Sequence, residues 1–167
     1  MEVRLATEDD GEGIRTVYNR EVLEGTATFD LRPRSPDEQR RWLIERSGAH
    51  AVVVATEGTR VVGFGSLSPY RDRPAYRTTV EDSVYVVPEA QGLGVGGAML
   101  DELLEVAGHH GFHTVVARIS GHNEASVALH RRRSFELVGV EREVGRKFSR
   151  WLDVVVMQLL LSERPSE

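Results

Sequence analysis

The sequence predicts one domain of the α/β (α+β) class, built on a mixed sheet. Helix-type and strand-type apolar periodicities alternate along the chain, a tight hairpin turn joins two of the expected strands, and no repeat or linker divides residues 1–167. Hairpins require antiparallel pairs, so the sheet cannot be wholly parallel. A chain of 167 residues is long enough to bury one core without metals or disulfides.

The N-terminal half shows clear start signals for two helices. Thr7 with the acidic pair Asp9 and Asp10 is a cap for the first, and Ser-Pro-Asp-Glu at residues 35–38 is a capping box with proline at the first helical position. Glu57-Gly58-Thr59 is typical of a hairpin turn. The elements expected here are a strand at residues 3–6, a helix after Thr7, a helix from Pro36 to about Arg46, and strands at 51–55 and 61–65.

The C-terminal half continues the alternation around a cluster of glycines. The elements expected here are a strand at about 78–87, a helix at about 96–111, a strand at 114–119, a short helix from Asn123, and strands near 135–143 and 152–161.

Composition narrows the classes of function. Lys and Arg number 21 against 26 Asp and Glu, for a net charge of -5, which argues against a general nucleic-acid binder. The cysteine count of 0 excludes disulfides, thiolate zinc sites and a cysteine nucleophile. The N-terminus has no signal-peptide pattern, and no apolar run is long enough for a membrane span, so we expect a cytoplasmic protein.

Residues 84–97, Val-Tyr-Val-Val-Pro-Glu-Ala-Gln-Gly-Leu-Gly-Val-Gly-Gly, are the most informative stretch. They read as an apolar strand, a glycine-rich turn and the start of an amphipathic helix. Free N–H groups at a helix start, together with the helix dipole, favour an anion, and glycines allow a pyrophosphate to approach the backbone. The pattern therefore indicates phosphate binding, although a purely structural loop would look the same.

Two nucleotide motifs compete for this stretch. A P-loop is excluded because no Gly-Lys-Ser/Thr follows. Gly92, Gly94 and Gly97 do fit G-x-G-x-x-G, but a dinucleotide fold wants that motif in its first strand–helix–strand unit, with an acidic residue about twenty positions later. Here the motif lies past mid-chain, so a nicotinamide cofactor is disfavoured.

The segment Gln91-Gly92-Leu93-Gly94-Val95-Gly96 resembles the Gln/Arg-x-x-Gly-x-Gly/Ala signature of the GNAT superfamily of acyl-CoA N-acetyltransferases. The resemblance narrows to the branch of phosphinothricin and methionine sulfoximine acetyltransferases. The blocks that carry it are Tyr18-Asn19, Thr26-Ala27-Thr28-Phe29, Tyr76-Arg77-x-Thr79-Val80-Glu81-x-Ser83-Val84-Tyr85-Val86 and Lys147-Phe148-x-Arg150-Trp151-x-Asp153. It implies a mostly antiparallel central sheet flanked by helices, and it covers nearly the whole chain.

The resemblance also implies how acetyl-CoA is held. Loop amides would bind the pyrophosphate, the strand backbone would pair with the pantetheine arm, and the amide of Val86 would face the thioester carbonyl. Asn123 and Ser126 match a second CoA-binding block, although Asn123 could equally be a helix cap. The expected CoA-binding residues are Val84, Tyr85, Val86, Gln91, Gly92, Leu93, Gly94, Val95, Gly96, Gly97, Asn123 and Ser126.

Glu81 is the expected general base, because acetyl transfer needs a neutral amine and amino-acid amines are mostly protonated at neutral pH. Alternation places Glu81 and Tyr85 on one strand face and Asp82 on the other, unless a bulge shifts the parity, so Asp82 stays a reserve candidate. His130 occupies the position where relatives place a tyrosine that protonates the departing thiolate, and it is the candidate acid. A solvent-facing glutamate and a structural histidine are the plainer alternatives.

The resemblance assigns Phe29, Arg71 and Tyr76 to the acceptor side, and the clustering of arginines before Glu81 adds Arg73, since a guanidinium suits a carboxylate or phosphinate. Individually, each arginine could be a solvated surface charge. Two positions depart from the family pattern: Ser134 replaces a glycine, and Tyr70 replaces a tryptophan. We expect no metal site.

These features predict an N-acetyltransferase that acts on the α-amine of phosphinothricin, methionine sulfoximine or methionine sulfone by direct attack on acetyl-CoA. Another amine (a peptide, a polyamine or an antibiotic) and a non-catalytic acyl-CoA sensor remain alternatives. Relatives of this kind are often dimers, so a homodimer is expected, with neither nucleic acid nor membrane as a partner.

Overall fold

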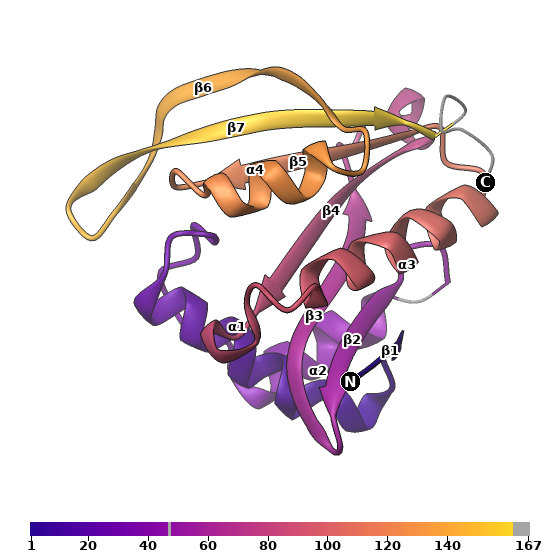
Figure 1. The fold of residues 1–167 in the computed structure, drawn as a ribbon, viewed down its shortest axis with the longest axis vertical. Helices are drawn as coiled ribbons and strands as arrows, with labels where there is room; N and C mark the ends of the chain where they lie inside the picture. Colours follow the sequence, from indigo (N-terminus) through magenta and orange to yellow (C-terminus); the bar gives the residue numbers. More distant parts are fainter. Residues whose placement is uncertain (47, 162–167) are drawn as a thin grey trace.

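A computed structural model describes residues 1–46 and 48–161, which form a seven-stranded sheet with helices on both faces (Figure 1). The strands are β1 (Glu2–Leu5), β2 (Val52–Glu57), β3 (Arg60–Pro69), β4 (Thr79–Val86), β5 (Thr114–Ser120), β6 (Glu136–Lys147) and β7 (Arg150–Leu160). The helices are α1 (Gly11–Glu24), α2 (Pro36–Glu45), α3 (Val95–His109) and α4 (Glu124–Arg131), with short 3₁₀ turns η1 (Glu8–Asp10), η2 (Pro74–Tyr76) and η3 (Pro88–Ala90).

The strand order is β1-β2-β3-β4-β5-β7-β6, and the sheet is mixed, as predicted. Every neighbouring pair is antiparallel except β4 and β5, which are parallel because α3 carries the chain back between them. The expected fold class is therefore confirmed. The parallel pair lies in the middle of the sheet, and the candidate site forms around it.

The start of the first helix differs from the prediction. Thr7 caps the 3₁₀ turn η1, and α1 begins only at Gly11. The cause is Asp10, whose carboxylate accepts two bonds from the Arg4 guanidinium (2.7 and 2.9 Å) and one from the Thr7 amide (2.8 Å). The Ser35 capping box at the start of α2 is confirmed, because the Glu38 amide donates to Ser35 Oγ.

Strands β6 and β7 run longer than the apolar pattern predicts and form a hairpin that reaches beyond the body of the sheet (Figure 1). Their turn consists of Phe148 (φ 50°) and Ser149 (φ 61°), two left-handed residues in a place where glycine or asparagine is usual. Because neither residue is typical of such a turn, the sequence does not reveal it. Ser134 (φ 66°) is left-handed as well, so the turn after α4 keeps the conformation that a glycine would favour.

The two faces of the sheet carry different helices. On one face, Phe64 of β3 packs edge-on against Tyr18 of α1 and Trp42 of α2, at centroid distances of 6.2 and 5.9 Å. On the other, Met99 and Leu103 of α3 are fully buried against β3. Within the described residues, no helix is both long and apolar enough to cross a membrane.

Candidate active site

A gap opens in the sheet between β4 and β5. The two strands pair only over residues 79–82 and 114–117. Beyond that point β4 stays paired with β3 as far as Val86, and β5 stays paired with β7 as far as Ser120. The strands therefore diverge (Figure 1), and the backbone edges that face each other across the gap have no strand between them.

Backbone amides of β4 point into this gap. The Val87 amide donates to the Val62 carbonyl on β3 (2.9 Å), and antiparallel pairing alternates, so Tyr85 also bonds to β3. Val84 and Val86 turn their amides the other way, where β5 no longer lies opposite them. The Val86 carbonyl is already used, since it accepts a bond from the Gln91 side chain (3.1 Å). The two amides are free to pair with an extended ligand.

The glycine-rich segment forms a cradle at the start of α3. Gly92 (φ 76°) and Gly94 (φ 81°) are left-handed, a conformation that disfavours other residues. Gly94 is the N-cap of α3, and within the described chain no side chain caps this end. The amides of the first turn are therefore free, and the positive end of the helix dipole adds to their attraction for an anion.

The cradle opens into a cavity of about 410 Å³ between the loop and α4. Leu93 is instead exposed at the loop, and Tyr85 lines the two neighbouring cavities. The expected CoA-binding residues that do line this cavity are Val84, Val86, Gln91, Gly92, Gly94, Val95, Gly96, Gly97, Asn123 and Ser126.

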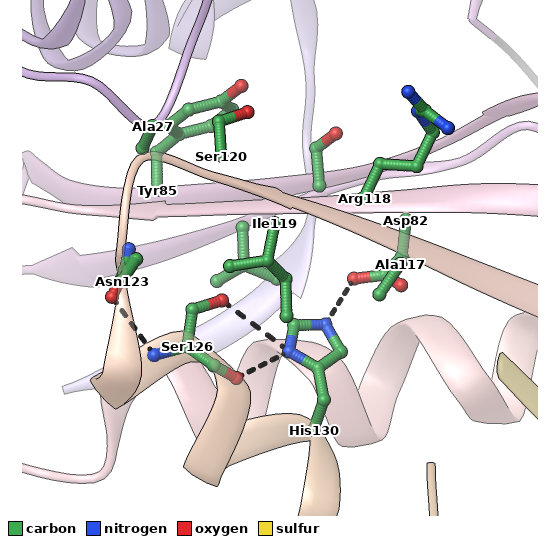
Figure 2. Close-up of a pocket in the computed structure, with 12 residues that line it drawn as sticks. Ala27, Asp82, Tyr85, Ala117, Arg118, Ile119, Ser120, Asn123, Ser126 and His130 are labelled. Atoms are coloured by element: carbon green, nitrogen blue, oxygen red, sulfur yellow. Dashed lines mark hydrogen bonds and ion pairs between the residues drawn. The ribbon is translucent and has the colours of Figure 1, made fainter. Parts of the chain in front are cut away.

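Asn123 is a helix cap as well as a lining residue. Its side-chain oxygen accepts a bond from the Ser126 amide (3.0 Å) at the start of α4. Both residues also line a smaller cavity at the gap itself, together with Ser83, Arg118 and other residues of β4 and β5 (Figure 2). The cap stabilises the start of α4, whose residues line both cavities.

His130 and Asp82 form a buried pair on the α4 face of the sheet (Figure 2). His130 Nε2 lies 2.9 Å from an Asp82 oxygen, and Nδ1 lies 2.7 Å from the Ser126 carbonyl. A carbonyl only accepts, so Nδ1 carries a proton, and the pair shares a second proton between Nε2 and the carboxylate. Burial alone lowers the pKa of His130, but the bond to Asp82 and its charge outweigh burial and raise that pKa overall.

The second oxygen of Asp82 is buried, and no described group bonds to it. Both residues line the cavity at the gap, and each is less than 5 % exposed. Sequence reasoning kept Asp82 only as a reserve base and did not join it to His130, which lies 48 positions away.

Glu81 lies on the opposite face, as alternation predicts, since the β3–β4 pairing has no bulge. It is half-buried beside the closed end of the gap. Burial raises the pKa of Glu81, and the positive charge of Arg118 acts in the other direction. A carboxyl with a raised pKa is a better proton acceptor than an exposed one, which suits a general base.

Arg118 is a charged residue near Glu81 that the sequence analysis did not identify as part of the candidate site. It projects from β5 on the side of the sheet opposite His130 (Figure 2), and it pairs with Glu141 of β6. One signal was available: Arg118 is the only charged residue in the strand Val115-Val116-Ala117-Arg118-Ile119.

The expected acceptor-side residues are only partly brought together. Arg71 stacks over Tyr70 and Tyr76, and its charge acts on both Glu81 and Glu141. Phe29 lies against Gly145 of the β6–β7 hairpin. Arg73 is exposed on the same loop as Arg71, and among the described residues its side chain makes no hydrogen bond or ion pair with this group.

Lys147, one of the residues that carry the family resemblance, is buried and makes a hydrogen bond that links two segments of the chain. It is 4 % exposed, and its ammonium donates to the Thr28 carbonyl (3.0 Å). This bond ties the hairpin to the loop that carries Phe29. Within residues 1–46 and 48–161, no group of three or more His, Asp or Glu side chains is placed to hold a metal ion.

Comparisons with known proteins agree with this geometry. The sequence model of the Acetyltransferase (GNAT) family matches residues 16–135. A phosphinothricin N-acetyltransferase from Streptomyces coelicolor is 41 % identical, over 92 % of each chain. An L-methionine sulfoximine/L-methionine sulfone acetyltransferase from Salmonella typhimurium is 37 % identical, over 98 % of this chain and 96 % of the relative.

A solved structure has the same fold. A GNAT superfamily phosphinothricin acetyltransferase from Sinorhizobium meliloti, in complex with acetyl-CoA, superposes with a TM-score of 0.92 at 38 % identity, over 99 % of this chain and 93 % of that one. Sequence identity over more than nine tenths of the chain, the matched fold and the family model together settle the classification. The chain belongs to the GNAT family of acetyltransferases.

Proposed function

We propose that the protein transfers the acetyl group of acetyl-CoA to the α-amine of an amino acid analogue such as phosphinothricin, methionine sulfoximine or methionine sulfone. The observation that carries this proposal is the gap between β4 and β5, which has a cradle suited to a diphosphate near its open end and the half-buried Glu81 carboxylate beside its closed end. The named activities of the similar proteins supply the substrate class.

The donor would enter from the α4 face. The cradle at Gly92 and Gly94 suits the pyrophosphate, and the free amides of Val84 and Val86 suit the amides of a pantetheine arm lying along β4. This path places the thioester toward the closed end of the gap. Val84 has the free amide nearest that end, so this amide, rather than the Val86 amide that the resemblance implied, would stabilise the oxyanion that forms on the thioester carbonyl. The Val86 amide would then hold the pantetheine arm.

Glu81 would act as the base. An incoming ammonium group loses a proton to the Glu81 carboxylate, directly or through a water, and the neutral amine then attacks the thioester carbon. Since the chain has no cysteine, the acetyl group would pass straight to the amine.

The His130–Asp82 pair would supply the acid. When the C–S bond breaks, the thiolate needs a proton, and the pair holds one between Nε2 and the carboxylate at the wall of the same cavity. The acid and the base would then work from opposite faces of the sheet, so the two carboxylates do not compete for one proton.

On the acceptor side, Arg71 with Tyr76 and Phe29 would border the substrate. Arg71 is the expected partner of an acidic group on the acceptor side chain, because it reaches the site from an exposed loop.

Acetyl-CoA and a free amino acid analogue also fit the cytoplasmic location that the sequence predicts.

We also propose that two copies associate through the β6–β7 hairpin. Strand β6 is an edge strand and exposes Leu137, Val138 and Val140, while β7 exposes Trp151. An apolar edge of this length is usually covered in a native protein.

Replacing Glu81 by Gln should lower kcat by about 10²- to 10⁴-fold, because it removes the proton acceptor. Binding of acetyl-CoA, measured by calorimetry, should not change. In the wild-type protein kcat/KM should fall as the pH drops through the Glu81 pKa, which lies above the ordinary glutamate value, and the variant should lack this limb. Glu105→Gln, on the exposed side of α3, is the matched control. Unchanged turnover in Glu81→Gln would point to a different base or to a non-catalytic sensor.

Replacing His130 by Gln should lower kcat by about a hundredfold or more, since the thiolate loses its proton donor. An acid works only while protonated, and the pKa of His130 is raised, so wild-type kcat should hold past the ordinary histidine pKa and fall at higher pH. The variant should lose this descending limb. His113→Gln changes an exposed histidine and is the control. Thermal melting checks that the variant folds, and a folded variant with wild-type kcat rules out the assignment.

Light scattering of the purified protein should give twice the mass of one chain. Replacing both Val138 and Val140 by Lys should shift the mass toward a single chain, because charges cannot be buried at an apolar interface. Exposed residues tolerate lysine, so the fold should survive. A monomer in the wild-type protein, or a dimer that both lysines leave intact, contradicts this interface.

A further inference from the structure

Arg118 is unusual for its place in the sheet. Its neighbours along β5, Val115, Val116, Ala117 and Ile119, are all buried, yet Arg118 projects at the wall of the gap and lines its cavity (Figure 2). Its side chain is 31 % exposed. A long cation on a central strand can reach whatever fills the gap.

The sheet register puts Arg118 beside the proposed base. Val116 lies directly opposite Glu81, so their side chains share a face, and Arg118 follows two residues later on that same face. The charge of Arg118 is the largest electrostatic influence on Glu81. An amine that gives its proton to Glu81 would therefore lie near Arg118, which is two residues beyond Val116 on the same face of the sheet.

Glu141 holds the guanidinium in place. Both Nη atoms of Arg118 donate to the two Glu141 oxygens, the second bond at 3.2 Å. This pair joins β5 to β6 across β7. A guanidinium has five N–H donors, and two are used here, so the edge that carries Nε remains available for a second carboxylate.

We propose that Arg118, oriented by Glu141, binds the carboxylate next to the reacting amine of the acceptor, so that the enzyme selects α-amino acids over simple amines. The inference rests on the proposed function and deepens it. Arg118 lies on β5 and lines the cavity at the gap, whereas Arg71 lies on an exposed loop. The two arginines therefore suit the two ends of an acceptor that carries an acid at each.

The test compares two acceptors that differ only in this carboxylate: methionine sulfone and 3-(methylsulfonyl)propan-1-amine. The wild-type protein should prefer the amino acid. In Arg118→Gln, kcat/KM for methionine sulfone should fall about 10- to 100-fold, as expected for one lost bond to a charged group, while that for the amine should change little. Glu141→Leu should shift the same ratio in the same direction, by less.

The ratio between acceptors separates recognition from indirect effects. If Arg118 acts only through Glu81 or through folding, both acceptors lose activity equally, and the inference is overturned. Arg142→Gln, an exposed neighbour of Glu141, should keep the wild-type ratio. A wild-type protein that acetylates neither acceptor nor any other amine overturns the proposed function as well; activity on both with an unchanged ratio in Arg118→Gln overturns this inference alone.

Discussion

The structure depends on one break in backbone pairing. A sheet satisfies its peptide groups by pairing neighbouring strands, and buried groups left unpaired are costly. Here the single parallel pair, β4 with β5, separates after Asp82, while each strand keeps its other neighbour. The break leaves the Val84 and Val86 amides without strand partners in the middle of a rigid sheet. A ligand with an extended amide-containing arm can satisfy them.

The same break organises the charges. Alternation along β4 sends Asp82 to the α4 face and Glu81 to the opposite face, so two adjacent carboxylates meet different environments. Asp82 is paired with His130 in a buried contact, and Glu81 faces Arg118. In the proposed mechanism, the base that takes the amine proton and the acid that protonates the thiolate therefore lie on opposite faces of the sheet. The sheet itself keeps the two roles apart.

Local features of this arrangement could be predicted from the sequence, and distant ones could not. The cradle and the α2 cap follow from residues close together in the chain, and the alternation at Glu81 held because β4 has no bulge. The pair of His130 with Asp82 depends on how α4 packs, and that of Arg118 with Glu141 depends on the register of β5, β7 and β6. The turn at Phe148 lacks the residues that usually mark one.

Amide hydrogen exchange with and without coenzyme A tests the gap most directly. If the pantetheine arm pairs with β4, exchange at Val84 and Val86 should slow on binding, while Tyr85, already bonded to β3, should change little. Binding that leaves both valine amides exchanging as in the free protein would contradict the account.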